Sequence, residues 1–409
     1  MRAGRSALSV PLFITIWFAV AFFFFTDDRY SLLRDLSILP SYDRGGQNSQ
    51  PARPERVKDG KILPAGNISL YLGAIFDTAQ TNLPTLQCPK FDENRYKTLQ
   101  AVDRRGSGIQ WFFALNLRNS LELLPRLLGS IIEAIRFLGP QHCALSIVEG
   151  LSPDGTADVL IALEDGLKAM GVRYFFQSST VDSKVDHRIV KLAELRNLAL
   201  QPLLFNPASA TEDAAVIFIN DVAACTDDIL ELVYQRQSLR ADMISRDING
   251  ESFFKIGDMG EWDRANYLFW DSPVSKARFE ANRPFQVFAC WNGGTVMSAR
   301  PFLEQNIRFR ASNDKLGECF MGEPQLLCKD LWFHGYDRIA IVPSVNLDYA
   351  LDRANKTKLE KGFVTEIVGE QDPSDDRINT WLGPPDKVRC MAGFDHQSMV
   401  AWNETLTHD

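Results

Sequence analysis

The chain has 409 residues, of which 45% are hydrophobic, and its formal net charge is −8 at pH 7. This length can bury one large core or two smaller ones, and the acidic balance gives no support to nucleic-acid binding, which favours a basic stripe. The seven cysteines and five histidines form neither a CxxC nor an HExxH pattern, so the usual zinc motifs are absent.

The first feature along the chain is an apolar segment at residues 6–26, which carries no charge over 21 residues. That length matches one bilayer-spanning helix. Two arginines lie in residues 1–5 and Asp27 and Asp28 follow the segment, so the positive-inside rule places the short tail in the cytosol and the rest in the lumen. We expect an uncleaved signal anchor. The alternative is a cleaved signal peptide, because residues 19–21 have the A-x-A form of a cleavage site.

Two further features agree with a lumenal location. Three N-x-S/T sequons predict N-glycosylation at Asn67, Asn355 and Asn403. In that compartment some of the cysteines are expected to form disulfides. Cys319 and Cys328 are close in sequence, and Cys88 and Cys390 lie in the flanking segments. The odd number leaves at least one thiol unpaired, and the sequence leaves the connectivity open.

Residues 27–107 have the composition of a stem, with glycines, prolines and mixed charges concentrated between residues 41 and 66. A regular pattern then begins, with apolar runs that predict strands at 109–117, 143–150, 172–177, 214–221 and 241–248. Helical periods over about 120–138, 158–170 and 188–204, and a helix after residues 226–228, separate them. This alternation predicts an α/β fold with a mostly parallel, doubly wound sheet over residues 108–350.

The pattern weakens after Gly250 into a loop rich in aromatic and acidic residues. A strand with a glycine turn is expected at 288–300, a helix at about 323–335 and a short strand at 339–345. Residues 351–409 contain spaced tryptophans, which predicts a strap packed on the domain rather than a free tail.

The sequence lacks GxGxxG, GxxxxGK[ST] and GxSxG, which argues against a dinucleotide-binding site, a P-loop and the simplest hydrolase site. What remains is a set of polar residues at predicted strand ends. Ligands of open α/β sheets bind at that edge. The set comprises Asn116, Glu149, Asp154, Asp221 and Asn292.

Four segments, LAELRNLAL, VIFINDV, CWNGGTV and ECFMGEPQLLCKDLWFHGYDRIAIVPSV, resemble the fungal capsule-associated α-1,3-mannosyltransferases, glycosyltransferase family 69, over residues 110–349. A weaker similarity follows at WLGPPDKVRC. The resemblance implies a GT-A glycosyltransferase domain in a type II Golgi membrane protein that uses GDP-mannose and a divalent metal, Mn²⁺ or Mg²⁺. The chain departs from the wider GT-A pattern at two places: Asn220-Asp221-Val222 stands where D-x-D is common, and Glu323-Pro324 where Glu-Asp is common.

On this resemblance, Asp221 is the expected metal ligand, with His334 or His396 as candidates to complete the coordination; a turn is the structural alternative for Asp221. The expected nucleotide-binding residues are Glu149, Asp154, Arg196 and Asn197. Asp154 is equally well explained by a helix-opening turn, and Arg196 by an ion pair with an acid. Trp291 and Asn292 offer a stacking plane and an amide to a sugar, although a tryptophan on a strand also suits a core. Glu323 is expected to be catalytic or to bind the acceptor, with helix capping as the alternative.

The sequence therefore predicts a membrane-anchored mannosyltransferase that moves mannose from GDP-mannose to a glycan hydroxyl, with α-1,3 linkage and retention, for cell-wall or capsule synthesis. One alternative is an enzyme that uses a UDP-sugar. The other is a non-catalytic, glycan-binding partner of a polysaccharide synthase, which the missing second carboxylate of D-x-D would suit. The acceptor and the oligomeric state stay open.

Overall fold

The computed structural model describes residues 57–78, 81–100, 108–182, 184, 187–246, 272–393 and 396–407. The compact unit runs from Val57 to Asp409. The expected signal anchor at 6–26 and the aromatic loop after Gly250 lie outside the described residues. Among the helices that the structure does describe, none is both long enough and apolar enough to span a bilayer.

The described strands form a mixed sheet of eight strands in the order β3-β2-β1-β4-β7-β5-β8-β6. A separate hairpin pairs β9 with β10. The strands are β1 Ile109–Leu117, β2 Cys143–Glu149, β3 Arg173–Ser178, β4 Ala210–Ile219, β5 Met243–Arg246, β6 Phe285–Gln286, β7 Gly294–Ser298, β8 Ile339–Val342, β9 Lys387–Gly393 and β10 His396–Ala401.

Most neighbouring strands of the large sheet are parallel, as the sequence predicts. Strands β6 and β7 are antiparallel to their neighbours. At one edge, Leu117 of β1 pairs with Glu149 of β2, and Ile219 of β4 pairs with Gly294 at the start of β7. The carboxyl ends of β1, β2 and β4 therefore meet the glycine turn before β7, which gathers residues from distant parts of the sequence at one edge.

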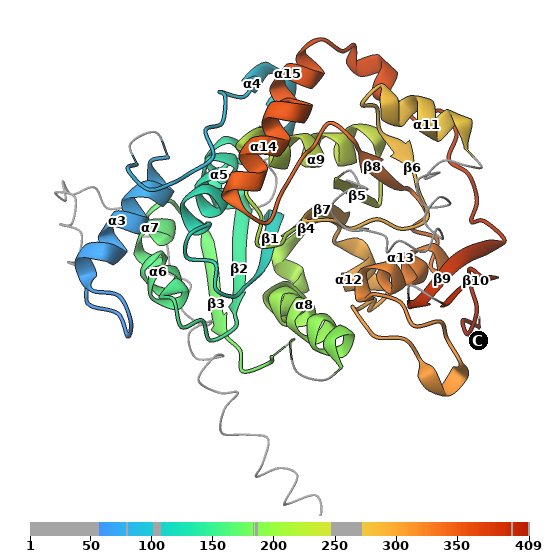
Figure 1. Cartoon of the computed structure of the whole chain (residues 1–409), viewed down its shortest axis with the longest axis horizontal. Helices are drawn as coiled ribbons and strands as arrows, with labels where there is room; N and C mark the ends of the chain where they lie inside the picture. Colours follow the sequence, from blue (N-terminus) through green and yellow to red (C-terminus); the bar gives the residue numbers. More distant parts are fainter. Residues whose placement is uncertain are drawn as a thin grey trace, which may run out of the picture. The chain divides into compact units, whose positions relative to one another are not determined.

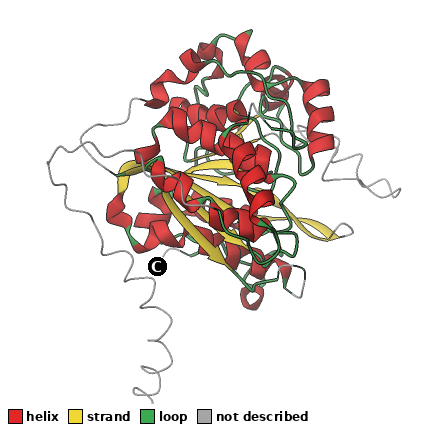
Figure 2. Cartoon of the chain, turned by 90° about the vertical axis from the view of Figure 1, so that its left-hand side faces the viewer, coloured by secondary structure: helices red, strands yellow, loops and turns green. Residues whose placement is uncertain are grey.

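Helices cover both faces of the sheet, and the strands lie between them (Figures 1 and 2). The helices are α3 Ala65–Phe76, α4 Glu93–Tyr96, α5 Leu124–Leu138, α6 Thr156–Ala162, α7 Glu164–Ala169, α8 Arg188–Phe205, α9 Thr226–Leu239, α11 Pro273–Glu280, α12 Arg300–Glu304, α13 Glu323–Phe333, α14 Leu351–Lys361 and α15 Val364–Gly369.

Two buried clusters hold these layers together, one on each face. In β4, Ile217 and Ile219 pack toward α5 and α9, whereas Val216 and Phe218 pack toward α8, α12 and α13. Successive strand side chains point to opposite faces, so the uninterrupted apolar run of β4 is what a strand covered on both faces requires.

The compact unit begins well before residue 108, the boundary that composition suggests. Ile68, Ile75 and Tyr96 are all buried. Asp158 at the start of α6 accepts backbone hydrogen bonds from residues 61–63, at 2.7 to 2.9 Å. The described part of the expected stem is therefore packed on the sheet domain through these buried side chains and backbone contacts.

Residues beyond 350 also pack on the sheet domain. Lys358 of α14 is almost fully buried and pairs with Asp228 of α9 at 2.6 Å. Asp376 accepts hydrogen bonds from Arg283 and Gln235. A disulfide joins Cys390 of β9 to Cys319.

Candidate active site

The first component of the site is the turn that follows β4. The N–H of Asn220 donates to the carbonyl of Gly293 at 2.8 Å, and the N–H of Val222 donates back to the carbonyl of Asn220 at 2.9 Å. The N–H of Ala223 donates to the carbonyl of Asp348 at 2.8 Å. Backbone contacts to two other loops thus fix the turn on either side of Asp221.

Asp221 is only partly exposed at this edge. Burial raises the pKa of its carboxyl, while its own backbone N–H and the charge of Arg196 oppose the shift. Among the described residues, no other side chain hydrogen-bonds this carboxylate. Its oxygens are therefore available to a hard divalent cation, and the residues fit such an ion with one carboxylate.

The second component is a buried ion pair beside this turn. The Nε of Arg196 donates to Oε1 of Glu323 at 2.9 Å, and the two residues are 7% and 2% exposed. Arg196 comes from the middle of α8 and Glu323 begins α13. Burial lowers the pKa of the guanidinium, and Glu323 opposes that shift. The sequence left open whether Arg196 contacts a nucleotide or pairs with an acidic side chain, and the structure shows an ion pair with Glu323.

Aromatic rings support the guanidinium from the side of the sheet. The central carbon of the Arg196 guanidinium lies 4.2 Å from the centre of the Trp291 ring, which is a cation–π distance. Trp291 packs on Phe218 at 5.4 Å and on Phe309 at 5.6 Å between ring centres. The Nε1 of Trp291 and the Oδ1 of Asn292 are buried and have no hydrogen-bond partner among the described residues. Such atoms are rare in native proteins and call for a partner.

The expected nucleotide-binding acids lie at the same edge, at the end of β2. Glu149 is fully buried and accepts from the N–H groups of Leu151 and Ser152, at 3.1 and 2.7 Å. Asp154 accepts from the N–H of Leu121 at 3.1 Å and from both donors of Thr156. These contacts shape the loops around β1 and β2, and contact with a nucleotide stays a prediction for both residues.

Asn197 follows Arg196 in α8 but faces elsewhere. Its amide exchanges two hydrogen bonds with the backbone of Phe309, at 2.8 and 3.0 Å. It also lines a surface cavity of about 750 Å³ between α8 and residues 308–311. The structure thus gives Asn197 a role in holding the Phe309 segment, and its expected nucleotide contact stays untested.

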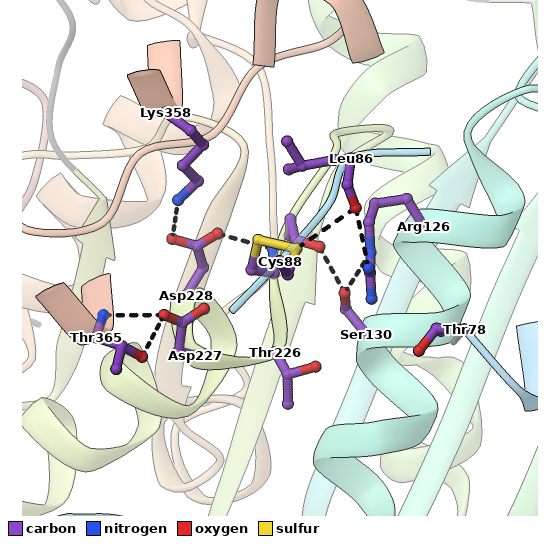
Figure 3. The surroundings of a disulfide bond; sticks show 12 residues. Thr78, Leu86, Cys88, Arg126, Ser130, Thr226, Asp227, Asp228, Lys358 and Thr365 are labelled. Carbon is purple, nitrogen blue, oxygen red and sulfur yellow. Dashed lines mark hydrogen bonds and ion pairs between the residues drawn. A yellow bond between two sulfur atoms is a disulfide. The ribbon is translucent and has the colours of Figure 1, made fainter. Parts of the chain in front are cut away.

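A disulfide anchors the far end of the Asp221 turn. Cys225 immediately precedes α9 and is bonded to Cys88 (Figure 3). Next to it, the hydroxyl of Ser130 on α5 donates to the carbonyl of Ala224 at 2.5 Å. The second disulfide, Cys319–Cys390, lies four residues before Glu323. Cys143, Cys290 and Cys328 are free and buried, so Cys319 pairs with a distant cysteine rather than with its neighbour in sequence.

Among the described residues, one group of three potential metal ligands was found: Cys225, Asp227 and Asp228. Figure 3 labels its two aspartates. This group is not a metal centre, because the sulfur of Cys225 is in a disulfide. Asp228 pairs with Lys358, and Asp227 accepts from the N–H and hydroxyl of Thr365. These acids join α9 to the C-terminal helices.

The structure separates His334 from Asp221. His334 follows the last residue of α13, whose 11 residues span about 16 Å from Glu323, and it leads to the amino end of β8 at the opposite edge of the sheet. It therefore cannot share an ion with Asp221. His396 begins β10.

Two further residues belong to the site: Asn220, which the sequence placed at the D-x-D position beside Asp221, and Tyr349, which the sequence did not predict. The amide of Asn220 donates to the hydroxyl of Tyr349 at 3.2 Å, and its Oδ1 lies 3.4 Å from a terminal nitrogen of Arg196. Asn220 was visible in the sequence as the neighbour of Asp221. Tyr349 carried no signal, because it follows an unrelated strand.

All three sequon asparagines are exposed.

Comparisons with known proteins identify the family of the chain. The family model described as Cryptococcal mannosyltransferase 1 matches residues 110–330, more than half of the chain. The alpha-1,3-mannosyltransferase CMT1 of Cryptococcus neoformans var. neoformans serotype D is 34% identical over 355 residues, which cover 78% of this chain and 75% of the relative.

Among solved structures, the chain is similar to S. aureus TarS 1-349 in complex with UDP, with a TM-score of 0.38, 14% identity and coverage of 59% of this chain and 60% of that chain. Another is the mannosyltransferase PcManGT from Pyrobaculum calidifontis in complex with GDP-Man and Mn²⁺, with a TM-score of 0.34, 13% identity and coverage of 69% and 72%. The chain belongs to the family described as Cryptococcal mannosyltransferase 1 and is a glycosyltransferase.

Proposed function

We propose that this glycosyltransferase transfers mannose from GDP-mannose to the 3-hydroxyl of a glycan in the secretory pathway and keeps the α configuration of the donor. The observation that carries the proposal is the position of Asp221 and Arg196 together at the end of β4, in a chain related to an alpha-1,3-mannosyltransferase. The bond from mannose C1 to the diphosphate oxygen breaks with its electron pair staying on that oxygen, a bond from C1 to the acceptor oxygen forms, and the proton of the acceptor hydroxyl passes to the departing diphosphate or to water.

The residues have distinct tasks in this proposal. Asp221 would hold Mn²⁺ or Mg²⁺, which when bound would neutralise charge on the diphosphate. Glu149 and Asp154 would keep the β2 loop in place for the nucleoside. Trp291 and Asn292, with their unsatisfied polar atoms, would face the sugar. Sugar hydroxyls are both donors and acceptors, so they suit one unpaired donor and one unpaired acceptor.

The compartment is part of the proposal. Two disulfides and three exposed sequons support a lumenal, oxidising environment, and we propose a type II Golgi membrane location with the N-terminal segment as the anchor.

The test is transfer of labelled mannose from GDP-mannose to a panel of small mannosides by the purified full-length protein with Mn²⁺. We expect α-1,3-linked product, and inhibition by GDP at lower concentration than by UDP. Transfer from a UDP-sugar alone, with stronger inhibition by UDP, would contradict the proposed donor.

A further inference from the structure

The ion pair between Arg196 and Glu323 is unusual for its place in the fold. Both side chains are almost fully removed from water, and burying a charge pair stabilises a fold less than apolar residues of the same size would. The pair lies beside the turn of Asp221, which interacts electrostatically with Arg196. The position of this ion pair indicates a function in the candidate active site rather than a contribution to the stability of the core.

The guanidinium is held from three directions. Glu323 accepts from Nε, Asn220 accepts weakly from one terminal nitrogen at 3.4 Å, and the ring of Trp291 lies under its plane. Arginine has five N–H donors. Within the described part of the chain, no acceptor is bonded to the second terminal nitrogen of Arg196. The guanidinium of Arg196 therefore has N–H groups that no described residue accepts. They lie near Asn220, the residue before Asp221.

Glu323 is poorly placed to deprotonate an acceptor. A general base must lie within hydrogen-bond reach of the proton that it removes. The carboxylate of Glu323 is 2% exposed, and one of its oxygens is engaged by Arg196. The geometry suits orientation of the guanidinium instead, because Glu323 is fixed at the start of α13 by Pro324 and the helix that follows.

We propose that Arg196 binds the diphosphate of the donor through its remaining N–H groups, and that Glu323 is a positioning residue that acts through Arg196. This inference rests on the proposed function for the presence of a nucleoside diphosphate. A planar guanidinium matches two phosphate oxygens at once. The chain has a single carboxylate where D-x-D would supply two, so the protein holds the ion with fewer charged ligands, and a cation built into the protein would share the charge of the diphosphate with that ion.

The role in the reaction follows from the charge. When the bond from C1 to the diphosphate oxygen breaks, its electron pair stays on that oxygen. Arg196 donates hydrogen bonds to this growing charge and transfers no proton, while C1 bonds to the acceptor oxygen. Fixed donors aimed at such charge contribute about 10²- to 10³-fold each in turnover.

A double-mutant cycle tests the inference, with Arg196→Met, Glu323→Gln and the double variant. We measure the affinity for GDP and GMP by calorimetry with Mn²⁺, and kcat and KM for mannose transfer. Arg196→Met should weaken GDP binding about 10-fold or more and GMP binding less, and should lower kcat by about 10²-fold. Glu323→Gln should weaken GDP binding in the same direction and should add little in the double variant.

Arg95→Met is a matched control. Arg95 is also buried, pairs with a glutamate, Glu231, at 2.8 Å, and lies 4.9 Å from the ring centre of Tyr234. The Arg95→Met variant should have a lower melting temperature and an unchanged affinity for GDP. If Arg196→Met unfolds the protein, Arg196→Lys, which keeps the charge and loses the fork, replaces it in the cycle. The Arg196→Lys variant should then bind GDP more weakly than the wild type does, and its loss of affinity for GMP should be smaller.

Two results would overturn the inference. One is unchanged GDP affinity in Arg196→Met or Arg196→Lys. The other is a Glu323→Gln variant that binds GDP normally, loses the acidic limb of the pH profile of turnover, and lowers activity by a factor that multiplies with that of the Arg196 variant; this combination would make Glu323 the base. If the wild type binds UDP and not GDP, the proposed donor fails, and the same cycle run with UDP decides the role of Arg196.

Discussion

The side-chain amide of Asn220 donates a 3.2 Å hydrogen bond to the hydroxyl of Tyr349, across 129 positions of the sequence. This contact joins the turn after β4 to the loop after β8. The backbone contact between Ala223 and Asp348 reinforces it. The position of Asp221 therefore depends on a loop that begins at a different strand, and the first prediction tests that dependence.

Tyr349→Phe should weaken Mn²⁺-dependent GDP binding by about 2- to 10-fold, because one neutral hydrogen bond contributes about 0.5–1.5 kcal/mol. The fold should be kept, since only the hydroxyl is removed. Calorimetric titration of GDP is the measurement. Tyr336→Phe is the control, because its hydroxyl contacts Glu304 at 3.4 Å away from Asp221. Equal effects of the two variants would contradict a specific role for Tyr349.

The Cys88–Cys225 disulfide gives the second prediction. Cys88→Ala with Cys225→Ala should lower the free energy of unfolding by about 2–5 kcal/mol. It should also weaken Mn²⁺-dependent GDP binding, because the turn from Asp221 to Cys225 loses its anchor. Thermal unfolding and calorimetry measure the two effects. Cys143→Ala, a buried free thiol at the amino end of β2, should change only stability. A folded variant with unchanged GDP affinity would show that the disulfide does not position Asp221.

The third prediction concerns the pH dependence of stability at Asp228. Burial raises the pKa of Asp228 to about 6, while Lys358 opposes the shift. The folded pKa lies above the unfolded value, so the stability from this group is present below about pH 4 and is lost as the pH rises through 6.

Lys358→Met removes the opposing charge and should raise this pKa further. The variant should therefore lose more melting temperature at pH 8 than at pH 5, where Asp228 can take up a proton. Lys356→Met, on the exposed side of α14, should show little effect at either pH. A loss of equal size at both pH values would contradict the account.

The fourth prediction tests topology. At least one of Asn67, Asn355 and Asn403 should carry a glycan. Deglycosylation of the full-length protein from its host should increase its gel mobility while it stays in the membrane fraction, and single Asn→Gln variants should identify the site. Release of a shortened, soluble chain that begins near Phe22 would show a cleaved signal peptide instead.

The sequence predicted the strands well where local chemistry decides the structure. Strand β1 has the expected bounds, because nine mostly apolar residues fit only a strand buried on both faces. Helix α5 begins at Leu124 rather than near 120, and Pro125 in its first turn explains the start. The expected strand at 288–300 is confined to 294–298, since Gly293 has a positive φ that breaks it.

The site was predictable only one residue at a time. Asp221 and Glu323 could be singled out because each follows or begins a regular element. Arg196 could be singled out as well, but its pairing with Glu323 could not be predicted, because the two residues are 127 positions apart and meet only through the packing of α8 and α13. The stem was predictable in part. The stretches at 71–76 and around Cys88-Pro89 already suggested packing on the main domain, and the spacing of Ile68 and Ile75, seven residues apart in α3, is a helical signal that agrees with it.

The central claim is that Asp221 binds a metal together with the donor diphosphate rather than closing a turn. Asparagine keeps an acceptor oxygen and suits a turn as well as aspartate does, whereas a divalent cation prefers the carboxylate. The deciding measurement is calorimetric titration of GDP, with and without Mn²⁺, on the wild type and Asp221→Asn. The control is Asp352→Asn, on the exposed side of α14. We predict that Asp221→Asn melts near the wild-type temperature and loses Mn²⁺-dependent GDP binding and most transfer activity. Unchanged binding with intact Mn²⁺ dependence would show that Asp221 is a turn residue and that the metal site lies elsewhere.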